Sequence, residues 1–253
     1  FMVFTEGMLA WPPDPEAWSI RWYRNMIGDC SADVVSSTVP CSTKWMKGTV
    51  NSFYIGIIAT VIATALGTLA ALGLSRPHMP YKGLIMAILI SPMIVPLIIT
   101  AAGMFFFYAR INLVYTFTGV ILAHVALATP FVVITVTATL VGFDMNMVKA
   151  AQSLGAKPMR TFFKVIMPLI LPGIISGALF AFITSFDEVV IVMFMASIDQ
   201  LTIPKQMWAG IRQEISPVIL CMATCLVLLS IFLLTTVELL RRRSEKLRGI
   251  KAR

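Results

Sequence analysis

The sequence predicts an all-helical integral membrane protein with five visible membrane-spanning segments. Of its 253 residues 58% are hydrophobic and only 13% are charged, and the mean hydropathy is +0.87. A soluble domain is typically about half apolar and about a quarter charged. The charged residues also gather between apolar runs that each exceed the roughly 20 helical residues needed to cross about 30 Å of hydrocarbon. Composition and spacing together therefore exclude a soluble domain.

The apolar runs divide the chain into three regions. We expect spans at residues 50–74, 83–108, 119–140, 169–195 and 217–237. They define an N-terminal segment at 1–48, a transmembrane domain at 49–240 and a basic tail at 241–253. If the five spans alternate in direction, thirteen of the twenty Lys and Arg residues fall on one side. The positive-inside rule then places the 144–168 connection and the C-terminal tail in the cytoplasm, and the N-terminal segment outside.

The N-terminal segment is rich in aromatic residues, including Trp11, Trp18, Trp22 and Tyr23. Trp and Tyr concentrate at membrane–water boundaries. We therefore expect an external segment whose aromatic residues lie at the interface, with a sugar-binding platform as the alternative.

The first span carries small residues at every fourth position, namely Ala59, Ala63, Gly67 and Ala71. Small side chains let helices in lipid approach closely, so this face is expected to pack on another helix. Pro92, Pro96 and Pro130 are expected to kink the second and third spans. His124 at membrane depth is interpreted as a hydrogen-bonded structural residue.

A group of polar residues lies inside the fourth apolar run. Thr184, Ser185, Asp187 and Glu188 interrupt it, and an acid at the bilayer centre costs on the order of 2.5–3.5 kcal/mol on insertion scales. On a continuous helix Thr184 and Glu188 would share a face, and only one of the adjacent acids would face a path. A structural ion-pair or hydrogen-bond role and cation recognition remain equal alternatives for these residues.

The 144–168 connection is expected to form two short helices. Asp144 can cap a helix that runs to Leu154, Gly155 suits the left-handed position that ends it, and Pro158 is placed to begin the next helix. No Gly-x-x-x-x-Gly-Lys-Ser/Thr phosphate loop occurs anywhere in the chain.

This connection resembles the cytoplasmic coupling loop of binding-protein-dependent ABC importers. The family pattern is Glu-Ala-Ala, three residues, Gly, nine residues and then Ile-x-Leu-Pro. Ala150, Ala151, Gly155 and Pro168 match it in register, whereas Lys149 replaces the acid. The resemblance implies that Lys149, Ala150, Ala151, Gly155 and Pro168 couple the chain to an ATPase.

A branch-level likeness to spermidine/putrescine permeases covers most of residues 49–240. It rests on Asn51-Ser52, Gly67-Thr68-Leu69-Ala70, Thr129-Pro130-Phe131-Val132-Val133, Pro172-Gly173-Ile174, Ser185-Phe186-Asp187-Glu188 and Glu214-Ile215-Ser216-Pro217. Opine and related uptake systems share this likeness.

The resemblance implies a type I ABC importer permease-like bundle in the bacterial inner membrane, transporting by alternating access. It implies cytoplasmic ATP-binding subunits that use ATP and Mg, a second permease subunit and an external solute-binding protein. The chain itself would bind no cofactor and no nucleic acid. Since the family commonly has six spans, the resemblance also implies a first helix missing before Phe1.

Two other functional classes compete with this reading. An ATP-independent secondary carrier could use Asp187 or Glu188 as a proton or cation site. A membrane enzyme is a third possibility, but the sequence shows no nucleophile–base pair or metal-type cluster to support it. Among the four cysteines, Cys30 and Cys41 share the external segment, where a disulfide is a possible pairing, whereas Cys221 and Cys225 lie in the last span.

Overall fold

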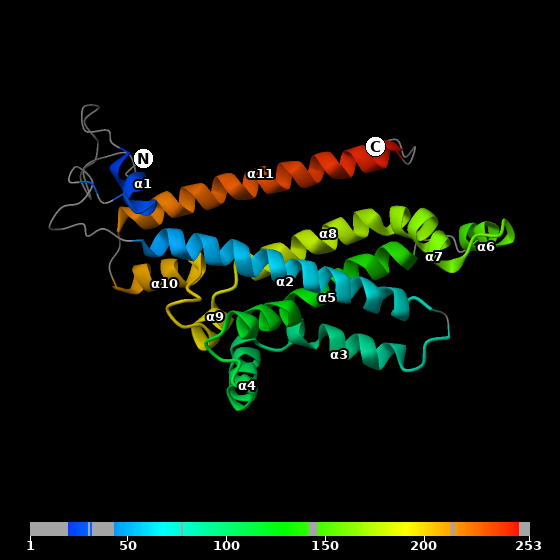
Figure 1. Cartoon of the computed structure of the whole chain (residues 1–253), viewed down its shortest axis with the longest axis horizontal. Coiled ribbons are helices and arrows are strands. Elements are labelled where there is room, and N and C mark those ends of the chain that lie inside the picture. The colour runs from blue at the N-terminus through cyan, green and yellow to red at the C-terminus, as the bar shows by residue number, and fades with distance from the viewer. Residues whose placement is uncertain are drawn as a thin grey trace. The chain divides into compact units, whose positions relative to one another are not determined.

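The computed structural model describes residues 20–29, 31, 43–76, 78–141, 146–213 and 216–247, and all regular structure in them is helical. In chain order the helices are α1 (Arg21–Met26), α2 (Lys44–Leu74), α3 (Lys82–Ile94), α4 (Leu97–Arg110), α5 (Phe117–Val141), α6 (Asn146–Ser153), α7 (Pro158–Thr161), the π-helical turn η3 (Phe162–Ile166), α8 (Met167–Phe186), α9 (Val190–Met195), α10 (Ile203–Gln213) and α11 (Pro217–Leu247). Figure 1 labels these helices.

The chain forms two compact units. The first combines Phe1–Tyr54 with Ala196–Arg253, and the second is Ile55–Met195. Four described helical stretches are long and apolar enough to cross a membrane: Lys44–Leu74, Phe117–Val141, Pro158–Phe186 and Pro217–Thr235. A fifth span results if α3 and α4 are counted together as one broken span. The expectation of an all-helical protein with about five spans is confirmed.

The second expected span, at 83–108, is not one continuous helix. The axes of α3 and α4 differ by 103° across a short break at Val95 and Pro96. A residue that precedes proline is disfavoured in the helical region, and Val95 is extended, with φ −70° and ψ 136°. Proline therefore breaks this span sharply, where the sequence predicted only a kink.

The fourth expected span, at 169–195, is displaced along the chain. Its helical stretch begins at Pro158 and ends at Phe186, and α9 is a separate short helix. Pro168 has no N–H to donate to the preceding turn, and the π-helical turn η3 lies directly before α8. Because the helical stretch ends at Phe186, Asp187 and Glu188 lie at a helix break rather than within a helix.

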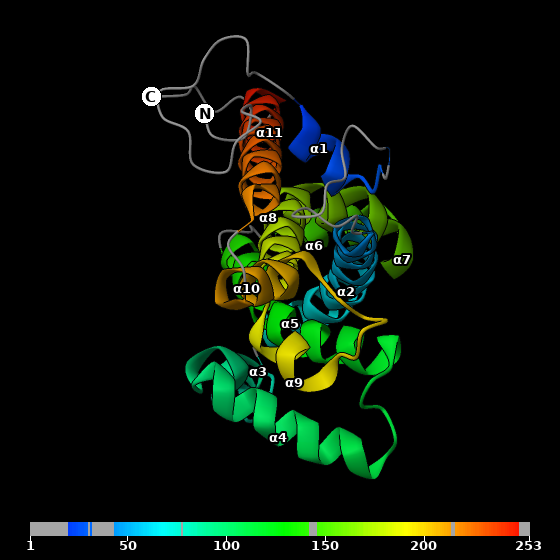
Figure 2. The same cartoon turned by 90° about the vertical axis from the view of Figure 1, so that its left-hand side faces the viewer.

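Helix α5 is the centre of the second unit. It is buried along much of its length and packs against α8, while α9 packs beside α4 (Figure 2). Gly177 of α8 meets α5 so closely that an added Cβ would lie 3.0 Å from the Cα atom of Val132. Gly67 of α2 approaches the same valine, since its added Cβ would lie 2.7 Å from the Val132 Cβ atom.

The small-residue face of the first span packs as predicted. Ala59, Ala63 and Ala71 of α2 are each 0% exposed. In lipid no hydrophobic effect drives helices together. Close backbone approach of this kind lets them associate by van der Waals packing instead.

In the first unit, α1 packs against α11. Trp22 is fully buried there and Asn25 is 2% exposed, so both side chains pack within the protein. Beyond α1 the chain turns at Asp29, whose carboxylate accepts hydrogen bonds from Ser31 and from Arg24. These bonds, chiefly those from Ser31, lower the pKa of Asp29. Trp11 and Trp18 lie outside the described residues.

Candidate functional site

The connection between α5 and α8 contains a helix end with a defined geometry. Gly155 has a φ of +78°, its N–H donates to the Gln152 carbonyl at 2.9 Å, and the Ala156 N–H donates to the Ala151 carbonyl at 3.0 Å. This pair of bonds is a Schellman motif, which requires a left-handed residue after the helix and so favours glycine. Pro158 then begins α7 after the extended Lys157, as predicted.

The surface of this connection is open and partly apolar. Lys149, Ala150 and Gly155 are exposed, and Leu154 is 89% exposed. Met147 and Met159 are also exposed, at 50% and 69%. Exposed large apolar side chains gathered on a polar connection are typical of a surface that contacts a partner or a membrane. Pro168 is exposed in the first turn of α8, while Asp144 and Met145 lie outside the described residues.

The two acids of the fourth apolar run have different environments. Helix α8 ends at Phe186, so Asp187 and Glu188 occupy the break before α9. Glu188 is 7% exposed, and its Oε1 atom accepts a hydrogen bond of 2.9 Å from the Ile191 N–H. Asp187 is exposed, and its carboxylate makes no hydrogen bond or ion pair with the residues that the structure describes.

This geometry corrects the helical-face argument. Because the helix stops at Phe186, Thr184 and Glu188 are not stacked on one face of a continuous helix. Instead, Glu188 satisfies an otherwise unpaired N–H in the first turn of α9, which is a capping role. Charge attraction from that helix end also favours a carboxylate at this position.

Ser185 and His124 form a buried pair beside this break. The Nδ1 atom of His124 lies 2.8 Å from the Ser185 Oγ atom and joins α5 to the last turn of α8. His124 is 1% exposed and Ser185 5%. The interpretation of His124 as a hydrogen-bonded structural residue is confirmed, although its Nε2 atom has no partner among the described residues.

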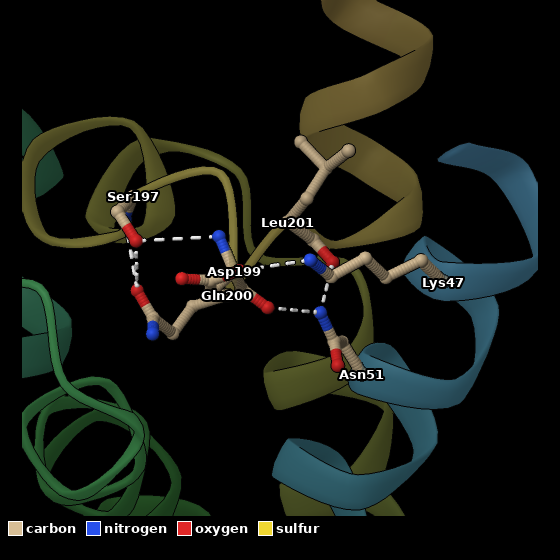
Figure 3. A network of polar contacts seen from close by, with 6 residues as sticks. All are labelled: Lys47, Asn51, Ser197, Asp199, Gln200 and Leu201. Atoms are coloured by element: carbon tan, nitrogen blue, oxygen red, sulfur yellow. Dashed lines mark hydrogen bonds and ion pairs between the residues drawn. The ribbon is translucent and has the colours of Figure 1, made fainter. Parts of the chain in front are cut away.

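Sequence reasoning missed a polar cluster in the first unit, which we call the α2 clamp: Lys47, Asn51 and Ser52 with residues 197–203. Figure 3 shows the part of it around Asn51, with Lys47, Ser197, Asp199, Gln200 and Leu201. Asn51 Nδ2 donates to the carbonyls of Asp199 at 2.7 Å and Leu201 at 2.9 Å. Ser52 Oγ accepts from the Ile203 N–H at 2.9 Å. From the sequence, Asn51 and Ser52 stand out only as part of the family resemblance, because no local pattern predicts hydrogen-bond partners about 150 residues away.

The loop of the clamp is also braced from within. The Gln200 Oε1 atom accepts bonds from the backbone N–H and the hydroxyl of Ser197, at 3.0 and 2.7 Å. Lys205 of α10 donates to the Ala196 carbonyl at 2.8 Å, and burial lowers the pKa of this lysine. The Lys47–Asp199 ion pair, at 2.9 Å, is exposed and so adds little stability.

The remaining candidate sites are a disulfide and a metal centre. Cys30 and Cys41 lie outside the described residues, so their pairing stays a prediction. The described part of the chain contains no group of three or more His, Cys, Asp or Glu residues that could hold a metal ion.

Comparison with known families decides the class of protein. Residues 52–246 match the profile described as "Binding-protein-dependent transport system inner membrane component". The chain belongs to this family. It is a permease subunit of a binding-protein-dependent ABC importer, a multi-pass protein of the inner membrane and a non-catalytic transport subunit. ATP hydrolysis is therefore the task of a partner subunit, and a stand-alone secondary carrier is excluded.

Curated relatives and solved structures agree with this assignment. The permease is 29% identical over 200 residues to the spermidine/putrescine transport system permease protein PotC of Haemophilus influenzae, covering 79% of this chain and 78% of that protein. It is 29% identical over 215 residues to the putrescine transport system permease protein PotI of Escherichia coli strain K12, covering 82% of this chain and 72% of that protein.

The fold is that of ABC importer permease chains. A chain of the MetNI methionine ABC transporter in an inward-facing conformation matches with a TM-score of 0.59 at 19% identity, covering 82% of the permease and 96% of that chain. A chain of a bacterial ABC transporter involved in the import of the acidic polysaccharide alginate matches with a TM-score of 0.63 at 15% identity. The match covers 83% of the permease and 70% of that chain. A binding-protein-dependent system implies ATPase, binding-protein and partner permease components.

Proposed function

We propose that this permease imports a polyamine such as spermidine or putrescine, or a related small cationic solute, by alternating access. The observation that carries the proposal is the exposed carboxylate of Asp187, which has no partner among the described residues and lies at a helix break within the apolar α8–α9 segment. The polyamine permeases among its relatives support the same class of cargo. Opine-like solutes are the alternative within this family.

The two acids have separate roles in this proposal. An ammonium group that leaves water needs a compensating charge, and Asp187 supplies one that is not already neutralised by the described residues. The Glu188 carboxylate accepts a hydrogen bond from the first turn of α9 and so stabilises the break. Thr184 and Ser185 border the same break, with Ser185 held by His124. A single exposed carboxylate also attracts a polycation without trapping it, which transport requires.

Coupling to ATP hydrolysis is assigned to the segment from Lys149 to Pro168. The ordered end of α6 and the exposed Met147 and Leu154 form a surface suited to a groove on an ATPase subunit, which would bind ATP and Mg. Closure of the ATPases would then push this segment and, through the helical stretch Pro158–Phe186, reach the break at Asp187. The charge distribution supports a cytoplasmic position for this segment and for the C-terminus.

The test is uptake by the complete transporter. The permease with its partner permease, ATPase and binding protein is reconstituted in proteoliposomes, and ATP-dependent uptake of labelled putrescine and spermidine is measured. Asp187→Asn keeps the shape and removes the charge, so we expect uptake to fall at least tenfold while the amount of assembled complex stays constant. The matched control is Asp199→Asn, another exposed acid. It leaves in place the backbone carbonyl that Asn51 binds, and the Asp199 carboxylate makes only an exposed ion pair, so uptake should stay within twofold of parental.

Three outcomes contradict the proposal. Parental complexes that import neither polyamine would remove the cargo assignment. Asp187→Asn at the parental rate would remove the carboxylate from the path. Loss of uptake that is fully explained by loss of assembled complex would make Asp187 structural.

A further inference from the structure

The α2 clamp satisfies backbone groups that no regular structure satisfies. The carbonyls of Asp199 and Leu201 lie in the loop between α9 and α10, and the Ile203 N–H belongs to the first turn of α10, where helices leave four N–H groups unpaired. Asn51 and Ser52 meet all three groups from one turn of α2. Both side chains are buried, at 8% and 3% exposed, so water does not replace these bonds readily.

The backbones also approach closely at this point. An added Cβ at Gly48 would lie 3.4 Å from the carbonyl carbon of Thr202 and 3.5 Å from the Ile203 nitrogen, which is ordinary van der Waals contact. Gly48 lies one turn before Asn51 and Ser52 on the same helix. Side-chain bonds and backbone contact therefore join the start of α2 to the loop over two successive turns.

We propose that Asn51 and Ser52 are positioning residues for import, which hold residues 197–203 on the first turns of α2 throughout the transport cycle, so that the two segments move as one body. Neither residue needs to touch the cargo or a partner. Their effect passes along the chain, because Ala196 directly follows α9 and Ile203 begins α10. The loop that connects these helices can transmit force only while its ends are fixed.

The first experiment measures ATP hydrolysis by the complete reconstituted complex, with and without its own binding protein purified with its bound solute. This readout does not depend on the identity of the cargo, so its outcome is separate from that of the polyamine proposal. Asn51→Asp replaces both amide donors by acceptors that face two carbonyl oxygens, and Asn51→Ala removes them. The matched control is Thr49→Ala, since the Thr49 hydroxyl bonds only to the Trp45 carbonyl of its own helix.

We expect both Asn51 variants to lower the maximal stimulated rate at least fivefold, with the half-saturating concentration of binding protein within twofold of parental. The two values should respond differently because Asn51 is buried and hydrogen-bonded within the chain, so its substitution leaves the exposed surface unchanged. Thr49→Ala should change neither value by more than twofold. A stimulated rate that stays parental in both Asn51 variants, or a change confined to the half-saturating concentration, would overturn the proposal.

The second experiment asks whether the clamp stays closed. Gly48→Cys and Thr202→Cys are combined in a chain whose Cys30 and Cys41 are serine, and a disulfide is formed by oxidation. We expect the stimulated rate to survive the disulfide, and the same disulfide to restore at least half of that rate in an Asn51→Ala background, reversibly on reduction. Inhibition of the parental background by the disulfide would show that the clamp must open during the cycle and would overturn the proposal.

Discussion

The imidazole Nδ1 atom of His124 lies 2.8 Å from the hydroxyl oxygen of Ser185, and this pair links α5 to the last turn of α8. The next residues along α8 are Phe186, where the helix ends, and Asp187. A buried hydrogen bond thus fixes the position of the helix end from which the proposed cation-binding carboxylate projects. We expect removal of this hydrogen bond to lower the stability of the protein, and to lower transport only as a result of that loss.

Ser185→Ala should lower the stability of the detergent-solubilised permease by about 0.5–2 kcal/mol, because it leaves both ring nitrogens of the buried His124 without a partner among the described residues. Hydrogen bonds between membrane helices average below 1 kcal/mol in double-mutant cycles, which sets the lower end. Thermal unfolding followed by tryptophan fluorescence measures the change. Ser176→Ala, in the same helix, serves as the control, and an equal effect of both variants would remove the special role of the pair.

Gly177→Ala should destabilise the second unit by about 1–3 kcal/mol, because the added Cβ would lie 3.0 Å from the Cα atom of Val132 and α5 and α8 would have to separate. Gly103→Ala is the matched control, since nothing lies within 4 Å of a Cβ added there. The midpoint of thermal unfolding in detergent is the measurement. Equal midpoints for the two variants would show that the α5–α8 contact adjusts without cost.

Much of this architecture follows from local rules that a sequence displays. Apolar length gives the spans, the spacing of Ala59, Ala63 and Ala71 gives a buried helix face, and glycine at 155 gives the helix end. Each of these properties depends on residues within one or two turns of each other. Prediction from the sequence is therefore dependable for them.

The features that the sequence did not reveal depend on competition between local rules or on distant partners. The effect of Pro96 on Val95 outweighs the apolar continuity of residues 83–108, so a sharp break replaces a kink. The helix end at Phe186 lets the Glu188 carboxylate accept the Ile191 N–H, a capping bond that a continuous helix would not leave open. The bonds of Asn51 to Asp199 and Leu201 span about 150 residues, and no periodicity encodes them.

Gly155→Val should uncouple ATP hydrolysis from uptake. With φ at +78°, a β-branched residue would strain the end of α6 by on the order of 1–2 kcal/mol, whereas the absence of any described atom within 4 Å of an added Cβ excludes a clash. The ratio of solute imported to ATP hydrolysed in proteoliposomes is the measurement. Gly73→Val is the control, because Gly73 also has an open surrounding but no positive φ. Full transport by Gly155→Val in a normally assembled complex would count against the coupling role.

Lys149→Glu should weaken assembly with the ATPase. Lys149 is exposed on α6 at the position where the family pattern has an acid, which points to an acidic or neutral surface in the facing groove. If that surface is acidic, an introduced carboxylate meets like charge and loses the attraction that Lys149 provides. We expect at least fivefold less ATPase to co-purify with the variant, whereas Lys157→Glu, which makes the same charge change on the same connection, should retain most of it. Improved assembly of Lys149→Glu would reverse this inference.

Glu188 and Asp187 should respond differently to the same kind of substitution. Glu188→Gln retains a side-chain oxygen that can accept the Ile191 N–H, so transport and stability should remain near parental. Glu188→Ala leaves that N–H unpaired in a buried site and should destabilise the protein by about 1–3 kcal/mol. Asp187→Ala, by contrast, removes no bond to a described residue and should leave stability unchanged while it lowers polycation uptake.

The pair of measurements, thermal unfolding in detergent and uptake in proteoliposomes, separates the two roles. A structural cap loses both properties together in Glu188→Ala and keeps both in Glu188→Gln, since only the acceptor matters. A cation-binding carboxylate loses uptake in Asp187→Asn and Asp187→Ala alike, since only the charge matters, and keeps the unfolding midpoint in both. If Glu188→Gln abolishes uptake at a parental midpoint, then the buried acid acts through its charge, and the assignment of recognition to Asp187 alone is wrong.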